Sequence, residues 1–118
     1  SYVAQDASGL AGSLMDYARS YRVDETLFLT ILRKLDFERV QFEKDMRSYS
    51  EGQKKKVLLA RSLSESAHLY IWDEPLNFID LLSRMQIEEL IQRCEPTMLF
   101  VEHDRAFCES VSTRMIRL

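Results

Sequence analysis

Two short, uninterrupted apolar runs in the last third of the chain constrain its fold more than any other feature. They are Leu69–Trp72 and Met98–Val101, and each is followed directly by acidic residues. A short apolar run without polar alternation is typical of a strand buried on both faces, as in a parallel sheet. A segment with helical period, from Asp80 as its cap to Arg93, separates the two runs. This alternation predicts an α/β fold with a parallel sheet.

The first two-thirds of the chain is predicted to be mainly helical. Only three glycines and two prolines interrupt its 118 residues, so long helices with few turns are expected. Periodicity and capping residues place helices at about residues 11–21, from Asp24 through Leu35, from Asp36 through Phe42, and from Ser50 to about Ser64. Strands at Leu69–Trp72 and Thr97–Val101, a last helix capped by Asp104 and a final strand at Met115–Leu118 complete the prediction.

Composition argues against several classes of protein. No apolar run approaches the ~20 residues that a membrane helix needs, and the first residues carry no basic, signal-like segment. The net charge of -3 gives no support for a broad nucleic-acid surface on this chain. The two cysteines, Cys94 and Cys108, are too few and too far apart for a disulfide framework or a zinc site. We therefore expect reduced thiols in a cytoplasmic protein.

Polar side chains follow both predicted strands where the strands end. Asp73 and Glu74 follow the first, and Glu102, His103 and Asp104 follow the second. Parallel sheets bind ligands beyond the carboxyl ends of their strands. There an aspartate can hold magnesium through water, a glutamate can orient an attacking water, and a histidine can contact a phosphate, which are the needs of phosphoryl transfer. The alternative is that Asp73 and Glu74 only terminate a strand.

The motif Ser50-Glu51-Gly52-Gln53 also has two interpretations. Ser-x-x-Gln is a capping box, in which both side chains satisfy free amides at the start of a helix. The same helix start, with a serine hydroxyl and a glycine that permits close approach, is suited to binding phosphate. The two interpretations are compatible, because a cap can also be a ligand.

A run of three lysines, Lys54-Lys55-Lys56, follows this motif. It could contact RNA, but a charge run on a helix is more often a solvated face. We therefore predict that these lysines face water.

Five motifs in order resemble the second half of an ATP-binding-cassette (ABC) ATPase domain. The segment from Tyr49 to Leu63 resembles the signature motif and its helix, and LYIWDEP resembles the Walker B strand with its catalytic glutamate. LNFID resembles the D-loop, FVEHD the switch histidine, and SYVAQD the Q-loop. The resemblance implies a partial ABC ATPase, related to the P-loop NTPases, with ATP and Mg²⁺ as cofactors.

The resemblance also implies a role for each matching residue. Ser50, Gly52 and Gln53 would contact the terminal phosphate of ATP held by a partner ABC domain, and His103 would contact that phosphate too. Glu74 would serve the attacking water, Asp73 would hold magnesium through water, and Gln5 would contact the metal or the water. Asn77 and Asp80 would lie at the interface between the two domains. The sequence departs from the family at Glu51, where glycine is usual, and at Tyr49, where leucine is usual.

The D-loop indicates a subfamily. Asn77 in PLNFID resembles the soluble ABC-F class, whose tandem ATPase domains act on the ribosome. IWDEPLNFID together with YSEGQKKKVLLA resembles the resistance-type members, in their second, C-terminal domain. The implied partners are a second ABC domain of the same parent chain and ribosomal RNA. Two alternatives stay open: the ATPase subunit of an ABC membrane transporter, and a non-enzymatic helical interaction module.

The phosphate-binding loop that the family requires is missing from the sequence. No G-x-x-x-x-G-K-[ST] occurs, and Gly9-x-x-Gly12 is followed by serine and leucine, with no lysine. We expect a partial domain: a Q-loop segment at 1–8, a helical sub-domain at 9–66, and the Walker B, D-loop and switch-histidine part of the core at 67–118. Alone, this piece is expected to be inactive and to self-associate through apolar strand faces and edges left open to water.

Overall fold

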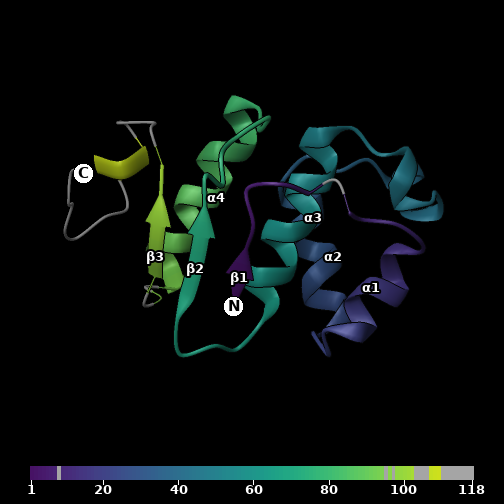
Figure 1. Ribbon diagram of the computed structural model, residues 1–118, viewed down its shortest axis with the longest axis horizontal. Coiled ribbons are helices and arrows are strands. Elements are labelled where there is room, and N and C mark those ends of the chain that lie inside the picture. The colour runs from purple at the N-terminus through teal and green to yellow at the C-terminus, as the bar shows by residue number, and fades with distance from the viewer. Residues whose placement is uncertain (8, 95, 97, 103–106, 110–118) are drawn as a thin grey trace.

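The computed structural model describes residues 1–7, 9–94, 96, 98–102 and 107–109. A helical part and a three-stranded sheet lie side by side (Figure 1). Residues 107–109 are helical, within the last predicted helix. Asp104, its predicted cap, and the predicted strand Met115–Leu118 lie outside the described residues.

The sheet is parallel, which confirms the prediction from the two apolar runs. Its strands are β1 (Tyr2–Val3), β2 (Tyr70–Asp73) and β3 (Met98–Val101), in the order β1-β2-β3. In the register, Val3 lies beside Trp72 and Trp72 beside Phe100, while Tyr2, Ile71 and Leu99 form the adjacent row.

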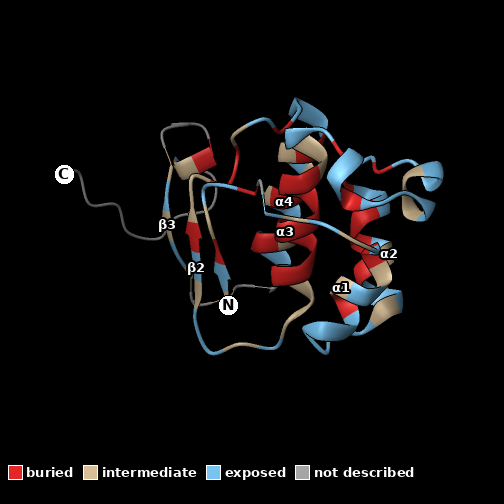
Figure 2. Cartoon of the chain, turned by 45° about the vertical axis from the view of Figure 1, so that its right-hand side comes forward, coloured by how far each residue is buried: buried red, intermediate tan, exposed pale blue. Residues whose placement is uncertain are grey.

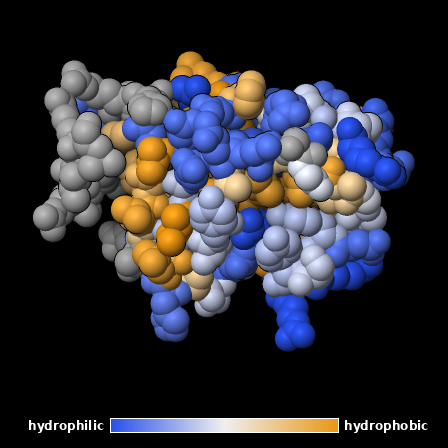
Figure 3. Space-filling view, in the orientation of Figure 1, coloured by the Kyte–Doolittle hydropathy of each residue, from blue (hydrophilic) through white to orange (hydrophobic). Residues whose placement is uncertain are grey.

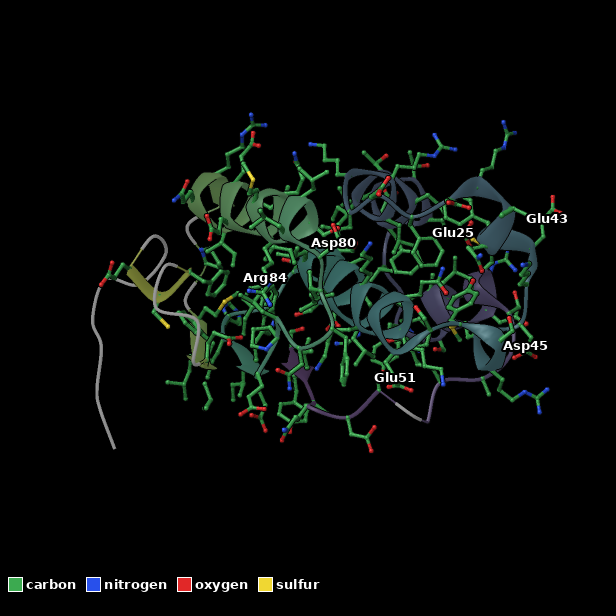
Figure 4. All side chains as sticks on the ribbon, turned by 90° about the horizontal axis from the view of Figure 1, so that it is seen from above. Glu25, Glu43, Asp45, Glu51, Asp80 and Arg84 are labelled. Atoms are coloured by element: carbon green, nitrogen blue, oxygen red, sulfur yellow. The ribbon has the colours of Figure 1, made fainter. Side chains whose placement is uncertain are left out.

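The two rows differ in burial. Val3 and Trp72 are fully buried, and Trp72 Nε1 donates to Ser62 Oγ of α3 (Glu51–Ser64) at 2.8 Å. α3 and α4 (Leu81–Cys94) both lie on this side of the sheet (Figures 1 and 4). Tyr2, Ile71 and Leu99 are 55%, 38% and 62% exposed on the other side. Apolar side chains accordingly gather over β2 and β3 in the space-filling view (Figure 3). The prediction that an apolar strand face is left open is confirmed for this face.

Local capping decides where the helices of the first half begin. α1 (Leu14–Ser20) starts after Ser13, whose side chain accepts from the Asp16 amide, three residues later than predicted. α2 (Glu25–Lys34) starts after Asp24, which accepts from the amide of Leu27 as predicted. The 3-10 segments η1 (Arg39–Glu43) and η2 (Met46–Ser48) and then α3 complete this half.

The predicted capping role of Asp36 is wrong. Asp36 follows α2 with φ 59°, a left-handed conformation that aspartate tolerates, and its amide donates to Arg33 O at 3.1 Å. η1 begins three residues beyond Asp36, at Arg39, and its N-cap residue Glu38 makes no side-chain capping hydrogen bond. Asp36 therefore helps to end one helix instead of starting the next.

α3 lies between the sheet and the pair α1 and α2 (Figure 1), and most of its length is buried (Figure 2). The three lysines of this helix are consequently 9%, 1% and 8% exposed, in the order Lys54, Lys55, Lys56. The prediction of a solvated face is therefore wrong. Helical periodicity gives no outward face to a helix that is packed on all sides.

Candidate functional site

β2 ends at Asp73, and the chain turns away from the sheet at Glu74. The Glu74 amide still belongs to the sheet, since it donates to Val101 O at 2.7 Å. Its φ is 45°, a left-handed conformation that glutamate rarely adopts. Non-glycine residues in such conformations concentrate at functional sites, where the surrounding structure holds them.

The carboxylate of Glu74 is held by two side-chain carboxamides. Gln5 Nε2 donates to Glu74 Oε2 at 2.6 Å, and Asn77 Nδ2 donates to the same oxygen at 3.1 Å. Gln5 follows β1, Glu74 follows β2, and Asn77 belongs to the loop between β2 and α4. The structure thus brings three of the sequence-predicted site residues together at the carboxyl edge of the sheet.

Glu102, which follows β3, contributes to the same edge. Its Oε2 accepts from the amide of Leu76 at 3.1 Å and so holds the loop that begins at Glu74. His103 lies outside the described residues, so its predicted contact with a phosphate stays a prediction.

Lys55 lies beneath these strand ends and was not predicted as a site residue. Its Nζ donates to Ala4 O at 3.1 Å and to Gln5 O at 2.8 Å. Burial lowers the pKa of Lys55, and the nearby carboxylates of Asp73, Glu74, Glu102 and Asp6 act in the opposite direction. The sequence offered one signal for this residue, because a lysine run next to Val57-Leu58-Leu59-Ala60 must lie partly against a core.

The signature motif forms the start of α3 with the predicted capping box. Gln53 N donates to Ser50 Oγ at 3.1 Å, and Ser50 N donates to Gln53 Oε1 at 2.8 Å. This confirms the capping role of Ser50 and leaves its contact with phosphate untested. The cap takes the Gln53 amide, while the positive end of the helix dipole still favours an anion at this helix start.

Gly52 has a role within the chain itself. A Cβ added to Gly52 would lie 2.5 Å from the carbonyl oxygen of Phe78, which is closer than real Cβ contacts come. Phe78 has φ 66°, so it too is left-handed. A glycine is therefore required where the D-loop backbone crosses the start of α3.

The D-loop, residues 76–80, is fixed to α3 and α4. From α4, Arg84 Nε donates to Ile79 O at 3.0 Å and Arg84 Nη2 to Leu76 O at 3.4 Å. From α3, Lys56 Nζ lies 2.9 Å from Asp80 Oδ1. Asp80 and Arg84 face α3 from the start of α4 (Figure 4).

Asp80 caps α4, as predicted, through a hydrogen bond of 3.0 Å from the Ser83 amide. Partial burial of Asp80 works against its ionisation, but the hydrogen bonds from Lys56 and Ser83 outweigh it and lower the pKa of Asp80 to about 2. Its predicted place at an inter-domain interface is not tested by this contact within the chain.

A cavity of about 360 Å³ opens between the Q-loop segment, the start of α3 and the D-loop. Glu51, the residue that departs from the family, lines it, and Glu51 Oε1 lies 4.0 Å from Lys54 Nζ. The lining residues are Gln5, Asp6, Ala7, Glu51, Lys55, Asn77 and Phe78.

The donor set fits magnesium only when a phosphate supplies further ligands. Among the residues that the structure describes, no three histidine, cysteine or carboxylate side chains are placed to hold a metal ion. Mg²⁺ keeps several waters and usually binds one or two carboxylates together with substrate phosphates. Asp73 and Gln5 at the strand ends fit that mode of binding.

A parallel sheet with carboxylates at its strand ends, beside a capped helix start, is the arrangement of an α/β nucleotide-binding domain. Residues 1–77 match the family model described as ABC transporter. Because this match spans more than half of the sequence, the chain belongs to the ABC transporter family, whose ATPase domains bind ATP and Mg²⁺. The predicted fold, part of an ABC ATPase domain, is confirmed.

Curated relatives include ABC-F proteins. The Ribosome protection protein VmlR of Bacillus subtilis (strain 168) is 35% identical over 82 residues, which are 70% of this chain and 15% of the relative. The ABC transporter F family member 4 of Arabidopsis thaliana is 38% identical over 82 residues, 65% of this chain and 11% of the relative. The chain spans at most 20% of the length of such relatives.

Solved structures agree on the fold. A putative cobalt transport ATP-binding protein superposes with a TM-score of 0.77 at 21% identity, over 93% of this chain and 44% of that one. None of the helices in the described part of the chain is long and apolar enough to cross a membrane.

Proposed function

We propose that this chain is part of an ABC-F ATPase that acts on the ribosome and confers antibiotic resistance by ribosomal protection. The observation that carries the ATPase role is the Gln5–Glu74–Asn77 network at the carboxyl edge of a parallel sheet. The ribosomal role is supported by the D-loop sequence and by the likeness to VmlR, a ribosome protection protein.

Glu74 is the group proposed to orient the attacking water and to accept its proton. Two carboxamide donors on Oε2 fix the orientation of the carboxylate. Such preorganisation favours catalysis because the group need not reorient during the reaction. His103 is proposed to contact the terminal phosphate from the end of the neighbouring strand.

Asp73 and Gln5 are the residues proposed to hold Mg²⁺, Asp73 through water. When bound, the metal would neutralise charge on the phosphates. Ser50, Gly52 and Gln53 are proposed to contact the terminal phosphate of ATP on a second ABC domain of the same parent chain, with the dipole and amides of α3 as the attractive groups.

An apolar surface beside the D-loop supports such a second domain. Phe78, Leu81, Leu82 and Met85 are 71%, 72%, 67% and 55% exposed. Asn77 and Asp80 lie in the same loop and are proposed to face the partner domain. Exposed apolar patches of this kind mark interaction sites.

The second candidate is the ATPase subunit of an ABC membrane transporter, which the description of the matching family favours. The family match and the parallel sheet argue against a non-enzymatic helical interaction module.

The test uses a longer protein that contains this chain together with a phosphate-binding loop. Glu74→Gln should keep ATP binding and lower turnover by ~10²–10⁴-fold, since a proton acceptor is lost. The same variant should co-sediment with ribosomes in the presence of ATP. Glu43→Gln, at an exposed position in η1 far from the strand ends (Figure 4), is the matched control and should turn over normally.

Unchanged turnover in Glu74→Gln would remove this residue from catalysis. Recovery of the variant in the membrane fraction alone would favour the transporter.

A further inference from the structure

Lys55 is a nearly fully buried cation that joins two parts of the candidate site. It is 1% exposed, and its ammonium donates to the carbonyls of Ala4 at 3.1 Å and of Gln5 at 2.8 Å. Lys55 belongs to the second turn of α3, and Gln5 follows β1 in the Q-loop segment. The two hydrogen bonds therefore tie the signature helix directly to the backbone that carries Gln5.

Gln5 connects Lys55 to Glu74, the carboxylate proposed for catalysis. Gln5 uses its backbone carbonyl to accept from Lys55 and its side chain to donate to Glu74 Oε2 at 2.6 Å. A carbonyl held in place limits the positions that the Gln5 side chain can reach. Gln5 thus links the ammonium of Lys55 to the carboxylate of Glu74.

The surroundings of Lys55 explain why a cation is stable there. Four carboxylates, those of Asp6, Asp73, Glu74 and Glu102, act on its charge from the ends of all three strands. A buried charge persists only when it is paired and hydrogen-bonded. Without the ammonium, these carboxylates would repel one another across the site.

We propose that Lys55 is a positioning residue of the proposed ATPase site: its ammonium clamps the Ala4–Gln5 backbone and so keeps the Gln5 carboxamide on Glu74. The role of this clamp in catalysis rests on the proposed function. The hydrogen bonds from Lys55 to the Ala4 and Gln5 carbonyls are a property of this chain and do not depend on that function. A lysine that only balanced charge would leave the Gln5 side chain where it is when the lysine is removed.

The experiment reads the Gln5 side chain by NMR in the ¹⁵N-labelled chain. The Gln5 carboxamide resonances are assigned with Gln5→Ala, and Glu74→Gln gives their position without the carboxylate partner. Lys55→Met keeps the buried stem and removes the ammonium, and it should move these resonances toward those of a solvated carboxamide. Lys54→Met, at the neighbouring position of α3, is the matched control and should leave them unchanged.

The fluorescence of Trp72, which is fully buried and is the only tryptophan, reports whether each variant is folded. A folded Lys55→Met chain with Gln5 resonances at the wild-type position would overturn the proposal. If Lys55→Met does not fold, the proposal is tested on the wild-type chain through the ammonium protons of Lys55. The clamp predicts slowly exchanging ammonium protons on Lys55, with hydrogen-bond couplings to the Ala4 and Gln5 carbonyl carbons. Rapid exchange without those couplings would equally overturn it.

These readouts need no ATP turnover. A catalytically irrelevant Glu74 would therefore refute the proposed function without touching the clamp, and a Gln5 side chain indifferent to Lys55 would refute the clamp alone.

Discussion

Replacing Gly52 by alanine tests how the D-loop and the signature helix fit together within one chain. The added Cβ would lie 2.5 Å from the Phe78 carbonyl oxygen and 3.6 Å from the carbonyl carbon. A backbone carbonyl cannot rotate aside as a side chain would. Either the D-loop or the first turn of α3 must therefore move.

Two opposing effects set the magnitude. Overpacking of a tight contact costs about 1–3 kcal/mol, and a clash with a backbone oxygen favours the upper part of that range. Alanine in place of glycine in a helix gains about 0.5–1 kcal/mol, so we expect a net loss of about 1–2 kcal/mol. For a chain of this size, 1 kcal/mol corresponds to roughly 4 °C in Tm. Thermal unfolding followed by Trp72 fluorescence should then show a decrease of about 4–8 °C.

Two controls isolate the contact. Gly9→Ala adds a Cβ that meets no atom within 4 Å, and it should leave the Tm almost unchanged. Phe78→Gly frees the loop to move, so the double variant with Gly52→Ala should lose less stability than the sum of the single variants. A Gly52→Ala chain as stable as the wild type would refute the reasoning, because the close approach would then carry no energy.

Three further predictions concern the other features of the site and the sheet. Ser50→Ala should lower the free energy of unfolding by about 1 kcal/mol through loss of the cap. In the longer protein, a drop in ATP turnover without unfolding would indicate that Ser50 also contacts phosphate. Unchanged turnover would indicate that Ser50 is a cap alone. The pKa of Asp80 lies near 2 in the folded chain, below its unfolded value of roughly 3.9. The stability that ionised Asp80 adds to the fold is therefore present above pH 4 and is lost as the pH falls through 2. Asp80→Asn should therefore be less stable than the wild type at pH 6, by a small margin because the carboxylate is half exposed, and the difference should vanish as the pH falls below 2. The open sheet face should make the chain self-associate, and Leu99→Lys should reduce its light scattering, whereas Val40→Lys, at an exposed position in η1, should not.

The parts of the structure that the sequence predicts are those set by local interactions. The capping box at Ser50 and the cap at Asp24 depend on residues three positions apart, and the apolar run Leu69–Trp72 is explained by its own composition. At the site, the position of Glu74 follows from the rule for strand ends. Its partners could be placed only through family resemblance, since Gln5 lies 69 residues away in sequence.

The features that the sequence did not predict depend on tertiary packing. Lys55 has the pattern of a solvated residue, and only the position of α3 between two layers buries it. Asp36 resembles a helix cap, but the chain reverses there in a left-handed turn that no local pattern required. The contact between Gly52 and Phe78 joins the start of α3 to the D-loop, and their separation in sequence gives no sign of it.

The left-handed residues at Glu74 and Phe78 place stability and activity in opposition. An L-residue in this conformation costs about 1–2 kcal/mol, and glycine or asparagine would relieve that cost. At Phe78, whose side chain is mostly exposed, replacement by glycine or asparagine removes no buried side-chain contacts. At Glu74, relief would remove the carboxylate proposed for catalysis. Laboratory evolution for thermostability alone should therefore enrich glycine and asparagine at both positions, while selection for turnover should keep glutamate at position 74.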